Sequence, residues 1–230
     1  MKPQIKMYIN PAIKERNSKN MGKTKVEITN QQKPSNKTQQ SNTVQDKLTQ
    51  LRGMTADEIL QKYEETDGLA VDIAKILYNL DIQVMPLDFT ELEKSEPISK
   101  LVQKKGIILG IVLIYAGKLS IFYRKGSSRN RARFTLAHEL AHCCKHIKEN
   151  VTDYMFRMDE SSDDEKEKEA NIFAGELLIP EDRLLYAYNK LILPYSSSLA
   201  KLFYVSVNVM EARLKYLELP YYNIRNEYIG

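Results

Sequence analysis

Apolar and polar residues follow two different periods along this chain of 230 residues, and each period predicts one type of secondary structure. Two short apolar runs flank the turn Ala116-Gly117-Lys118, a pattern that predicts a β-hairpin over residues 107–123. A third short run, residues 81–84, alternates as a strand does. Elsewhere the apolar residues recur at helical spacing. The predicted helices cover residues 55–66, 69–80, 134–146, 163–178, 181–191, 199–206 and 207–217.

Several side chains predict where these helices begin and end. Thr55, followed three residues later by Glu58, forms a capping-box pattern at the first helix. Ser127 or Ser128 can cap the helix that follows the hairpin. Pro180 ends the helix over 163–178, because the residue before a proline resists the helical conformation.

The first fifty residues differ from the rest in composition and charge. They hold ten of the 34 basic residues, three of the 30 acidic residues and few large apolar side chains. Such a segment cannot bury enough surface to offset its ordering entropy, so we predict a disordered basic tail over residues 1–50. The remainder is slightly acidic, which argues against a broad nucleic-acid-binding face. We expect an α+β fold, with a small antiparallel sheet and helices over residues 51–195 and a helical, helix-turn-helix-like segment over residues 196–230.

One predicted helix carries the sequence His138-Glu139-Leu140-Ala141-His142, a His-Glu-x-x-His pattern. Residues four apart lie on one face of a helix, so His138 and His142 can bind one Zn²⁺ ion side by side. Glu139 projects beside that face, where it can accept a proton from a water molecule at the metal. The chain has three histidines, all at four-residue spacing, which favours a metal site over a chance pattern. The third, His146, lies two turns from His138, so we interpret it as a helix-end residue or as a contact of a ligand.

The two cysteines of the chain, Cys143 and Cys144, are neighbours in the same helix. Neighbouring helical side chains point about 100° apart and are poorly placed for a disulfide, which favours packing roles and a reducing compartment. Residues 1–30 lack the apolar segment of a secretion signal, and the longest apolar run, residues 107–116, is too short to cross a bilayer. We therefore expect a cytoplasmic protein that does not enter a membrane.

A tetrahedral catalytic zinc site with two histidines and a water needs one more protein ligand. The predicted helix over residues 163–178 offers several glutamates, and their neighbours decide among them. Glu167 and Asn171 share a face, so Glu167 can bind the metal while the amide oxygen of Asn171 orients one of the histidines. Glu169 has Phe173 at the same spacing and gains no such partner. We predict Glu167 as the third ligand and keep Glu169 in reserve.

Two long motifs carry these residues. They read Arg133-Phe134-Thr135-Leu136-Ala137-His138-Glu139-Leu140-Ala141-His142 and Glu167-Lys168-Glu169-Ala170-Asn171-Ile172-Phe173-Ala174-Gly175-Glu176-Leu177-Leu178-Ile179-Pro180. Together, in this order, they resemble the ImmA/IrrE-type metallopeptidase family, with Ala141 for the usual Gly and Ile179 where Met is common. The resemblance implies a gluzincin-like fold with one Zn²⁺ per chain. It implies that His138, His142 and Glu167 are the ligands and that Glu139 is the general base.

The resemblance also implies a protease that cuts a DNA-binding repressor of a mobile element or stress response, so a helix-turn-helix transcriptional repressor is the expected partner. An alternative is a non-catalytic module that binds or senses a partner on the same fold. An intact Glu139 favours the protease, because a binding module does not need a general base. Direct DNA binding through residues 199–217 is a weaker alternative, because its second helix has only two basic residues, Arg213 and Lys215.

We also expect residues 121–123 of the hairpin to lie near the cleft, where an edge strand can hold substrate.

Overall fold

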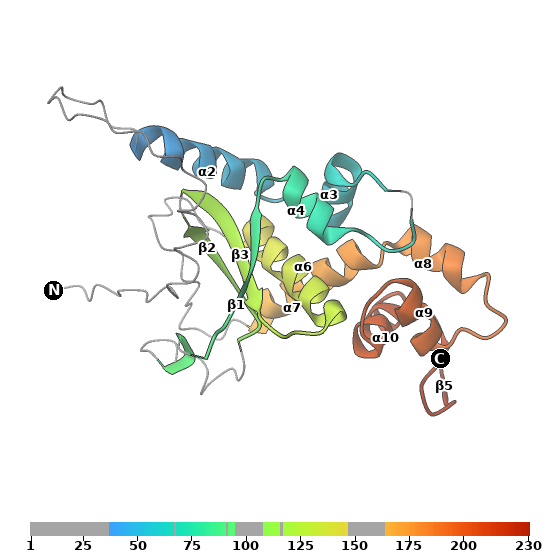
Figure 1. Ribbon diagram of the computed structural model, residues 1–230. Helices are drawn as coiled ribbons and strands as arrows, with labels where there is room; N and C mark the ends of the chain where they lie inside the picture. The colour runs from blue at the N-terminus through green and yellow to red at the C-terminus, as the bar shows by residue number, and fades with distance from the viewer. Residues whose placement is uncertain (1–36, 67, 91, 95–107, 116, 147–163) are drawn as a thin grey trace, which may run out of the picture. The chain divides into compact units, whose positions relative to one another are not determined.

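The computed structural model describes residues 37–66, 68–90, 92–94, 108–115, 117–146 and 164–230 (Figure 1). Residues 36–230 form one compact unit, and every element described below belongs to it. The larger part of the expected disordered tail, residues 1–36, lies outside the described residues. The fold of the described part is α+β, as predicted, with helices gathered around a small sheet (Figure 1).

The sheet has three strands in the order β1-β3-β2. The predicted hairpin is present as β2 (Gly110–Tyr115) and β3 (Lys118–Arg124), which pair antiparallel with Val112 opposite Ile121. Strand β1 (Gln83–Leu87) pairs with β3 in parallel, so the expectation of an antiparallel sheet is wrong for this pair. The physical reason is the connection: a tight turn forces β2 and β3 antiparallel, whereas β1 reaches β3 only after a long connection and the whole of β2.

Helix α6 (Arg129–Lys145) is the central element of the unit. It packs on β2 and β3 of the sheet, and other sides of it contact α2, α4 and α7 (Figure 1). Ser128 caps its start, since the hydroxyl accepts a hydrogen bond from the backbone N–H of Arg131. Leu136, Ala137, Leu140 and Ala141 are buried, so the apolar residues before and between His138 and His142 fix the helix in the core.

Helix α7 (Asp164–Leu178) packs along α6 and brings a second polar face to it. Ala170, Phe173, Ala174 and Leu177 are buried. The helix ends before Pro180, as predicted, and Pro180 is itself the N-cap of helix α8 (Glu181–Tyr188). The apolar side of α7 therefore sets the rotation at which its acidic residues face α6.

Two short helices precede the sheet. Helix α3 (Ala56–Tyr63) has the predicted capping box, in which Thr55 and Glu58 each accept from the other's backbone N–H. Helix α4 (Ile73–Asn79) begins later than residue 69, because the Asp72 carboxylate accepts from the backbone N–H of Lys75 and caps the helix there. Residues 69–71 therefore lie before the helix, where Val71 is buried in the core and Leu69 packs against it.

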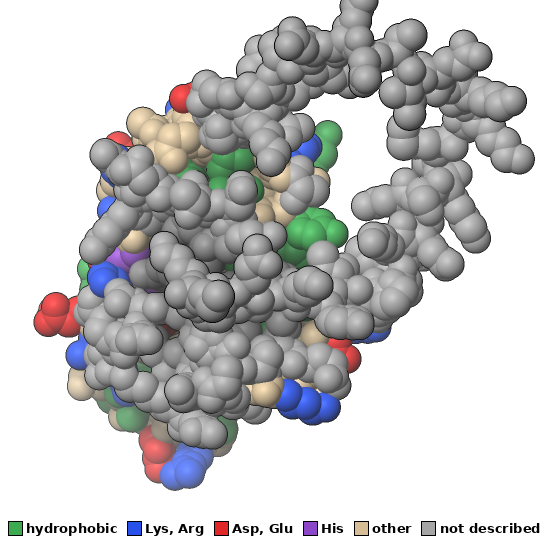
Figure 2. Space-filling view, turned by 90° about the vertical axis from the view of Figure 1, so that its left-hand side faces the viewer, with side chains coloured by type: hydrophobic (Ala, Val, Ile, Leu, Met, Phe, Trp, Pro, Cys, Tyr) green, Lys and Arg blue, Asp and Glu red, His purple; other side chains and the backbone are tan. Residues whose placement is uncertain are grey.

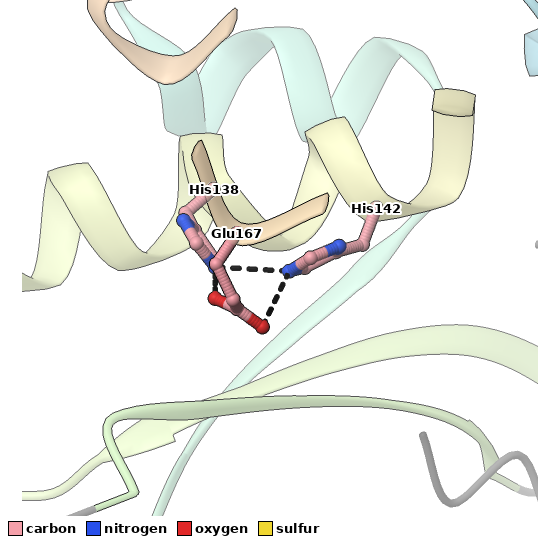
Figure 3. A group of neighbouring side chains, drawn as sticks. All are labelled: His138, His142 and Glu167. Carbon is pink, nitrogen blue, oxygen red and sulfur yellow. Dashed lines mark hydrogen bonds and ion pairs between the residues drawn. The ribbon is translucent and has the colours of Figure 1, made fainter. Parts of the chain in front are cut away.

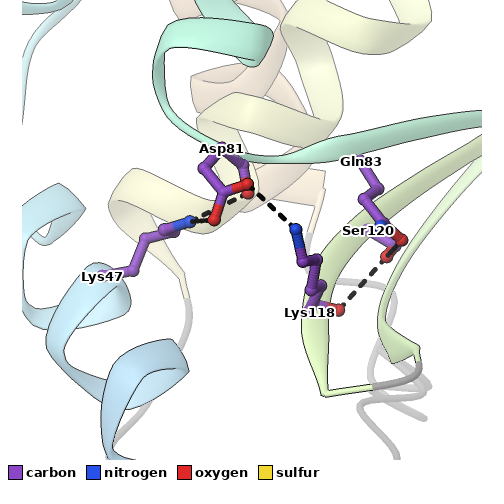
Figure 4. A network of polar contacts seen from close by, with 5 residues as sticks. All are labelled: Lys47, Asp81, Gln83, Lys118 and Ser120. Carbon is purple, nitrogen blue, oxygen red and sulfur yellow. Dashed lines mark hydrogen bonds and ion pairs between the residues drawn. The ribbon is translucent and has the colours of Figure 1, made fainter. Parts of the chain in front are cut away.

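Helix α2 (Lys37–Leu51) occupies residues that were expected to belong to the disordered tail, and for residues 37–50 that expectation is wrong. Leu48 and Leu51 are buried in the core. The Lys47 ammonium group donates to the backbone carbonyl of Asp81 at 2.8 Å and to its carboxylate at 2.9 Å, and Lys118 at the start of β3 donates to the same carboxylate (Figure 4). Val44, Leu48 and Leu51 recur at helical spacing and are buried, so a few apolar residues within a polar segment dock the helix on a surface that the rest of the fold supplies.

The C-terminal segment contains α9 (Ser196–Leu202), a short turn and α10 (Val207–Tyr216), followed by a hairpin of β4 (Tyr221–Tyr222) and β5 (Tyr228–Ile229). Helix α10 lies where it was expected, whereas α9 begins three residues before the predicted range 199–206 and ends four residues before its end. A helix-turn-helix-like role remains a prediction. Arg213 is buried and its guanidinium donates to the carbonyl of Ile179, so this basic residue of α10 serves the core. Among the described helices, none is long and apolar enough to span a membrane.

Candidate metal centre

Helix α6 presents His138 and His142 on the same face, one turn apart, as their spacing requires. Their Nε2 atoms lie 2.9 Å from each other, so both imidazoles turn the same nitrogen toward a single point. The His142 side chain is 5 % exposed and that of His138 is 16 % exposed. The pair therefore lies at the edge of the core.

Glu167 reaches this point from α7. Its Oε2 lies 3.2 Å from His138 Nε2 and its Oε1 lies 3.9 Å from His142 Nε2. Figure 3 shows the two rings and the carboxylate pointing toward one another from the two helices. The carboxylate is 42 % exposed, and histidine surface is visible in the space-filling view (Figure 2). The centre thus opens to the surface on the side of its acidic member.

The donor atoms have the separations that one tetrahedral ion requires. Atoms bound at the usual zinc distances stand about 3.3 Å apart around the ion, and the three separations here are 2.9, 3.2 and 3.9 Å. Within the described part of the chain, His138, His142 and Glu167 are the residues that bring three potential ligand atoms so close together. Two imidazoles and one carboxylate fit a metal in both chemistry and spacing.

The electrostatics of the centre favour a cation. Burial lowers the pKa of His138, but the hydrogen bond from its ring to Glu167 and the negative charges of Glu139 and Glu167 outweigh the burial, with a further contribution from Asn171. The net result is a pKa of His138 above its ordinary value of 6.5. A proton and a divalent cation are stabilised by the same carboxylates, so the surroundings of His138 suit a bound metal ion.

Asn171 makes the contact that was expected from its spacing to Glu167. Its amide oxygen lies 3.0 Å from His138 Nδ1. An amide oxygen only accepts, so the ring nitrogen that faces it carries the proton and the other nitrogen, Nε2, presents a lone pair. Asn171 therefore fixes the tautomer in which His138 can act as a ligand through Nε2.

Glu139 is 9 % exposed, and its side chain lies against the first residue of β2. A Cβ atom added to Gly110 would stand 2.6 Å from Glu139 Oε1 and 2.5 Å from Thr135 Cγ2, whereas ordinary contacts are 3.4–4 Å. Gly110 is thus the residue that makes room for the glutamate. Gly110 lies within the apolar run over residues 107–116, and a glycine within a strand often marks such a close approach.

Glu169, the reserve ligand, lies elsewhere. Its Oε2 is 2.9 Å from His146 Nε2, and His146 Nδ1 is in turn 2.8 Å from His142 Nδ1. His146 is therefore a contact of a histidine in the centre, which is one of the two interpretations that its spacing allowed. The pairing of Glu169 with His146 was not predicted, because it depends on how α7 lies against the end of α6.

The fold and the centre together define a class of protein. An α+β unit that gathers two histidines and a glutamate from adjacent helices, with a buried glutamate beside them, has the arrangement of a metal-dependent peptidase. A sequence model of the Peptidase_M78 family, described as the IrrE N-terminal-like domain, matches residues 80–215, which include the whole centre. The chain belongs to this family of metal-dependent peptidases, and the resemblance to the ImmA/IrrE type is confirmed. Comparison with curated proteins gave no match.

Proposed function

We propose that this protein is a zinc-dependent peptidase that hydrolyses a peptide bond in a regulatory protein. The observation that carries the proposal is the convergence of His138, His142 and Glu167, beside which Glu139 is held against Gly110. A set of two imidazoles and one carboxylate with a neighbouring acid suits a catalytic zinc site, which keeps one position open for the reaction. One zinc ion per chain is expected.

Each residue of the centre has a defined part in this proposal. When zinc is bound, it lowers the pKa of a coordinated water toward about 7 and polarises the scissile carbonyl. Glu139 accepts the proton that the attacking water loses and passes it to the leaving amine. The Glu139 carboxylate lies close against the backbone at Gly110, which limits its movement toward β2 before substrate arrives. Asn171 keeps Nε2 of His138 available as a ligand atom.

The substrate is proposed to bind along β2 as an added strand. Residues 121–123 were expected to lie near the cleft, and Tyr123 is paired with Gly110, which lies against Glu139. They belong to β3, however, which is the central strand and is paired on both sides, so they cannot themselves take an added strand. Among the described strands, β2 is paired on one side and begins at Gly110, in contact with Glu139. A peptide that continues the sheet beyond β2 would pass the general base, and its main chain would supply much of the affinity.

A helix-turn-helix transcriptional repressor is the proposed substrate. Support comes from the membership of the chain in the IrrE N-terminal-like family and from the motif resemblance described above. The slight acidity of residues 51–230 also suits a basic DNA-binding protein as partner. Direct DNA binding by this chain is not part of the proposal, because Arg213 of α10 is buried.

Two measurements test the proposal. The first is the zinc content of the purified protein and of His142→Ala and Glu167→Ala, with about one ion per chain expected in the wild type and loss in both variants. The second compares new protein N-termini in cells that express the wild type or Glu139→Gln. Cleavage products that need Glu139, at least one from a DNA-binding regulator, are expected. A protein without zinc, or a Glu139→Gln variant that acts as the wild type does, would point to the binding module instead.

A further inference from the structure

The histidine that directly follows α6 lies between the metal centre and a glutamate of α7. His146 follows the final residue of α6, and its backbone N–H donates to the carbonyl of His142 at 3.0 Å. Its side chain is 4 % exposed. Nδ1 of His146 lies 2.8 Å from Nδ1 of His142, and Nε2 lies 2.9 Å from Oε2 of Glu169. A continuous row of hydrogen bonds thus joins Glu169, through His146, to His142.

The positions of the protons in this row follow from the chemistry of the groups. A ligand nitrogen must present its lone pair to the metal, so a neutral His142 that binds through Nε2 carries its proton on Nδ1. Two ring nitrogens at 2.8 Å need one donor and one acceptor, so Nδ1 of His146 accepts. The proton of His146 is then on Nε2, where it is donated to the carboxylate of Glu169. Every member of the row is satisfied by this single arrangement.

We propose that His146 and Glu169 are positioning residues, which hold His142 in the tautomer and orientation that bind the metal. The proposal rests on the zinc-dependent function proposed above and adds to it a second support. Asn171 holds the ring of His138 from α7, and the pair of His146 and Glu169 holds the ring of His142. Both supports end on α7, which also supplies Glu167, so the packing of α7 on α6 assembles the ligand set and its supports together.

The same geometry separates this role from direct ligation. His142 turns Nε2 toward His138 and Glu167, and its opposite nitrogen toward His146. His146 therefore lies behind His142 as seen from the centre, and Glu169 lies behind His146. Replacement of His146 or Glu169 therefore leaves all three metal ligands in the chain but weakens the hydrogen bonding that holds the ring of His142. Outer hydrogen-bond partners of this kind change metal affinity by about 10- to 100-fold.

The proposal is tested by zinc affinity, measured by competition with a chromophoric chelator on the full chain. His146→Leu keeps much of the ring's apolar volume but cannot accept from His142, so we expect zinc binding to weaken by about 10- to 100-fold. His146→Gln offers an amide oxygen to the same N–H and is expected to recover most of that loss. Glu169→Ala is expected to weaken binding less, because its carboxylate is 54 % exposed. Glu165→Ala, the same change on the same helix, is the matched control and should bind as the wild type does.

Nitrogen chemical shifts of the imidazoles give a readout that packing alone would not change. In the zinc-loaded wild type we expect His146 to carry its proton on Nε2. We expect the Nε2 chemical shift to change in Glu169→Ala, because that proton no longer has a carboxylate to donate to. Unfolding of the metal-free variants checks that each is folded. Wild-type zinc affinity in a folded His146→Leu, or a proton on Nδ1 of His146 in the wild type, would overturn the proposal. A wild type that binds no zinc would instead overturn the function on which it rests.

Discussion

Replacement of Gly110 by alanine tests whether the close approach of β2 to Glu139 matters for the reaction. The added Cβ would stand 2.6 Å from Glu139 Oε1 and 2.5 Å from Thr135 Cγ2. The strand cannot retreat easily, since Gly110 is paired opposite Tyr123 of β3. Helix α6 cannot retreat either, because it is packed between the sheet and α7. The Glu139 side chain is the part that can move.

The size of the effect follows from the distances. To restore an ordinary contact of 3.4 Å, the Glu139 carboxylate must shift by roughly 0.8 Å, and a misplacement of about 1 Å costs on the order of 10²-fold in rate. Overpacking of this kind also destabilises by about 1–3 kcal/mol. We therefore expect Gly110→Ala to remain folded, to keep its zinc, and to lose about two orders of magnitude in kcat/KM.

The assay is hydrolysis of a fluorogenic peptide that spans the identified cut site, with zinc content and urea unfolding measured on the same samples. Gly175→Ala is the matched control: a Cβ at Gly175 of α7 meets nothing within 4 Å, so activity should be unchanged and stability should rise by about 0.5–1 kcal/mol. Thr135→Ser in the Gly110→Ala background should recover stability but not activity, because the contact with Glu139 remains. Wild-type kcat/KM in Gly110→Ala would refute the reasoning.

Three further predictions concern stability. Burial raises the pKa of the Cys144 thiol from its ordinary value of 9.0 to about 12. Between these pH values the thiol is ionised in the unfolded chain but protonated in the folded one, so the free energy of unfolding should fall by about 1.4 kcal/mol per pH unit. The absence of this fall in Cys144→Ala would identify Cys144 as the group responsible. Arg183 donates to both carboxylate oxygens of Glu64, whose side chain is 5 % exposed, so Arg183→Met should cost about 3–5 kcal/mol in urea unfolding; a neutral result would mean that the carboxylate finds another partner. Leu48→Ala in α2 should cost about 2–5 kcal/mol, whereas no loss would show that α2 does not contribute to the core.

Features that depend on local spacing can be read from the amino-acid sequence alone. His138 and His142 share a face because a helix has 3.6 residues per turn, and no tertiary contact is needed for that result. The capping box of Thr55 and Glu58 and the cap at Ser128 are likewise decided within four residues. The hairpin of β2 and β3 follows from two apolar runs and a short turn. Each of these features depends on neighbours in the chain, which the sequence displays directly.

Tertiary structure decided the features that depend on how elements far apart in the chain pack together. The packing of α7 on α6 placed Glu167 beside the two histidines and Glu169 behind them against His146, although the two glutamates are only two residues apart. Strand β1 joined β3 in parallel because a long connection leaves the direction of pairing open. Helix α2 became ordered because the core offered a surface to its few leucines. Gly110 is needed because the Glu139 carboxylate, 29 residues away in sequence, packs against it, and no local sequence pattern predicts such a contact.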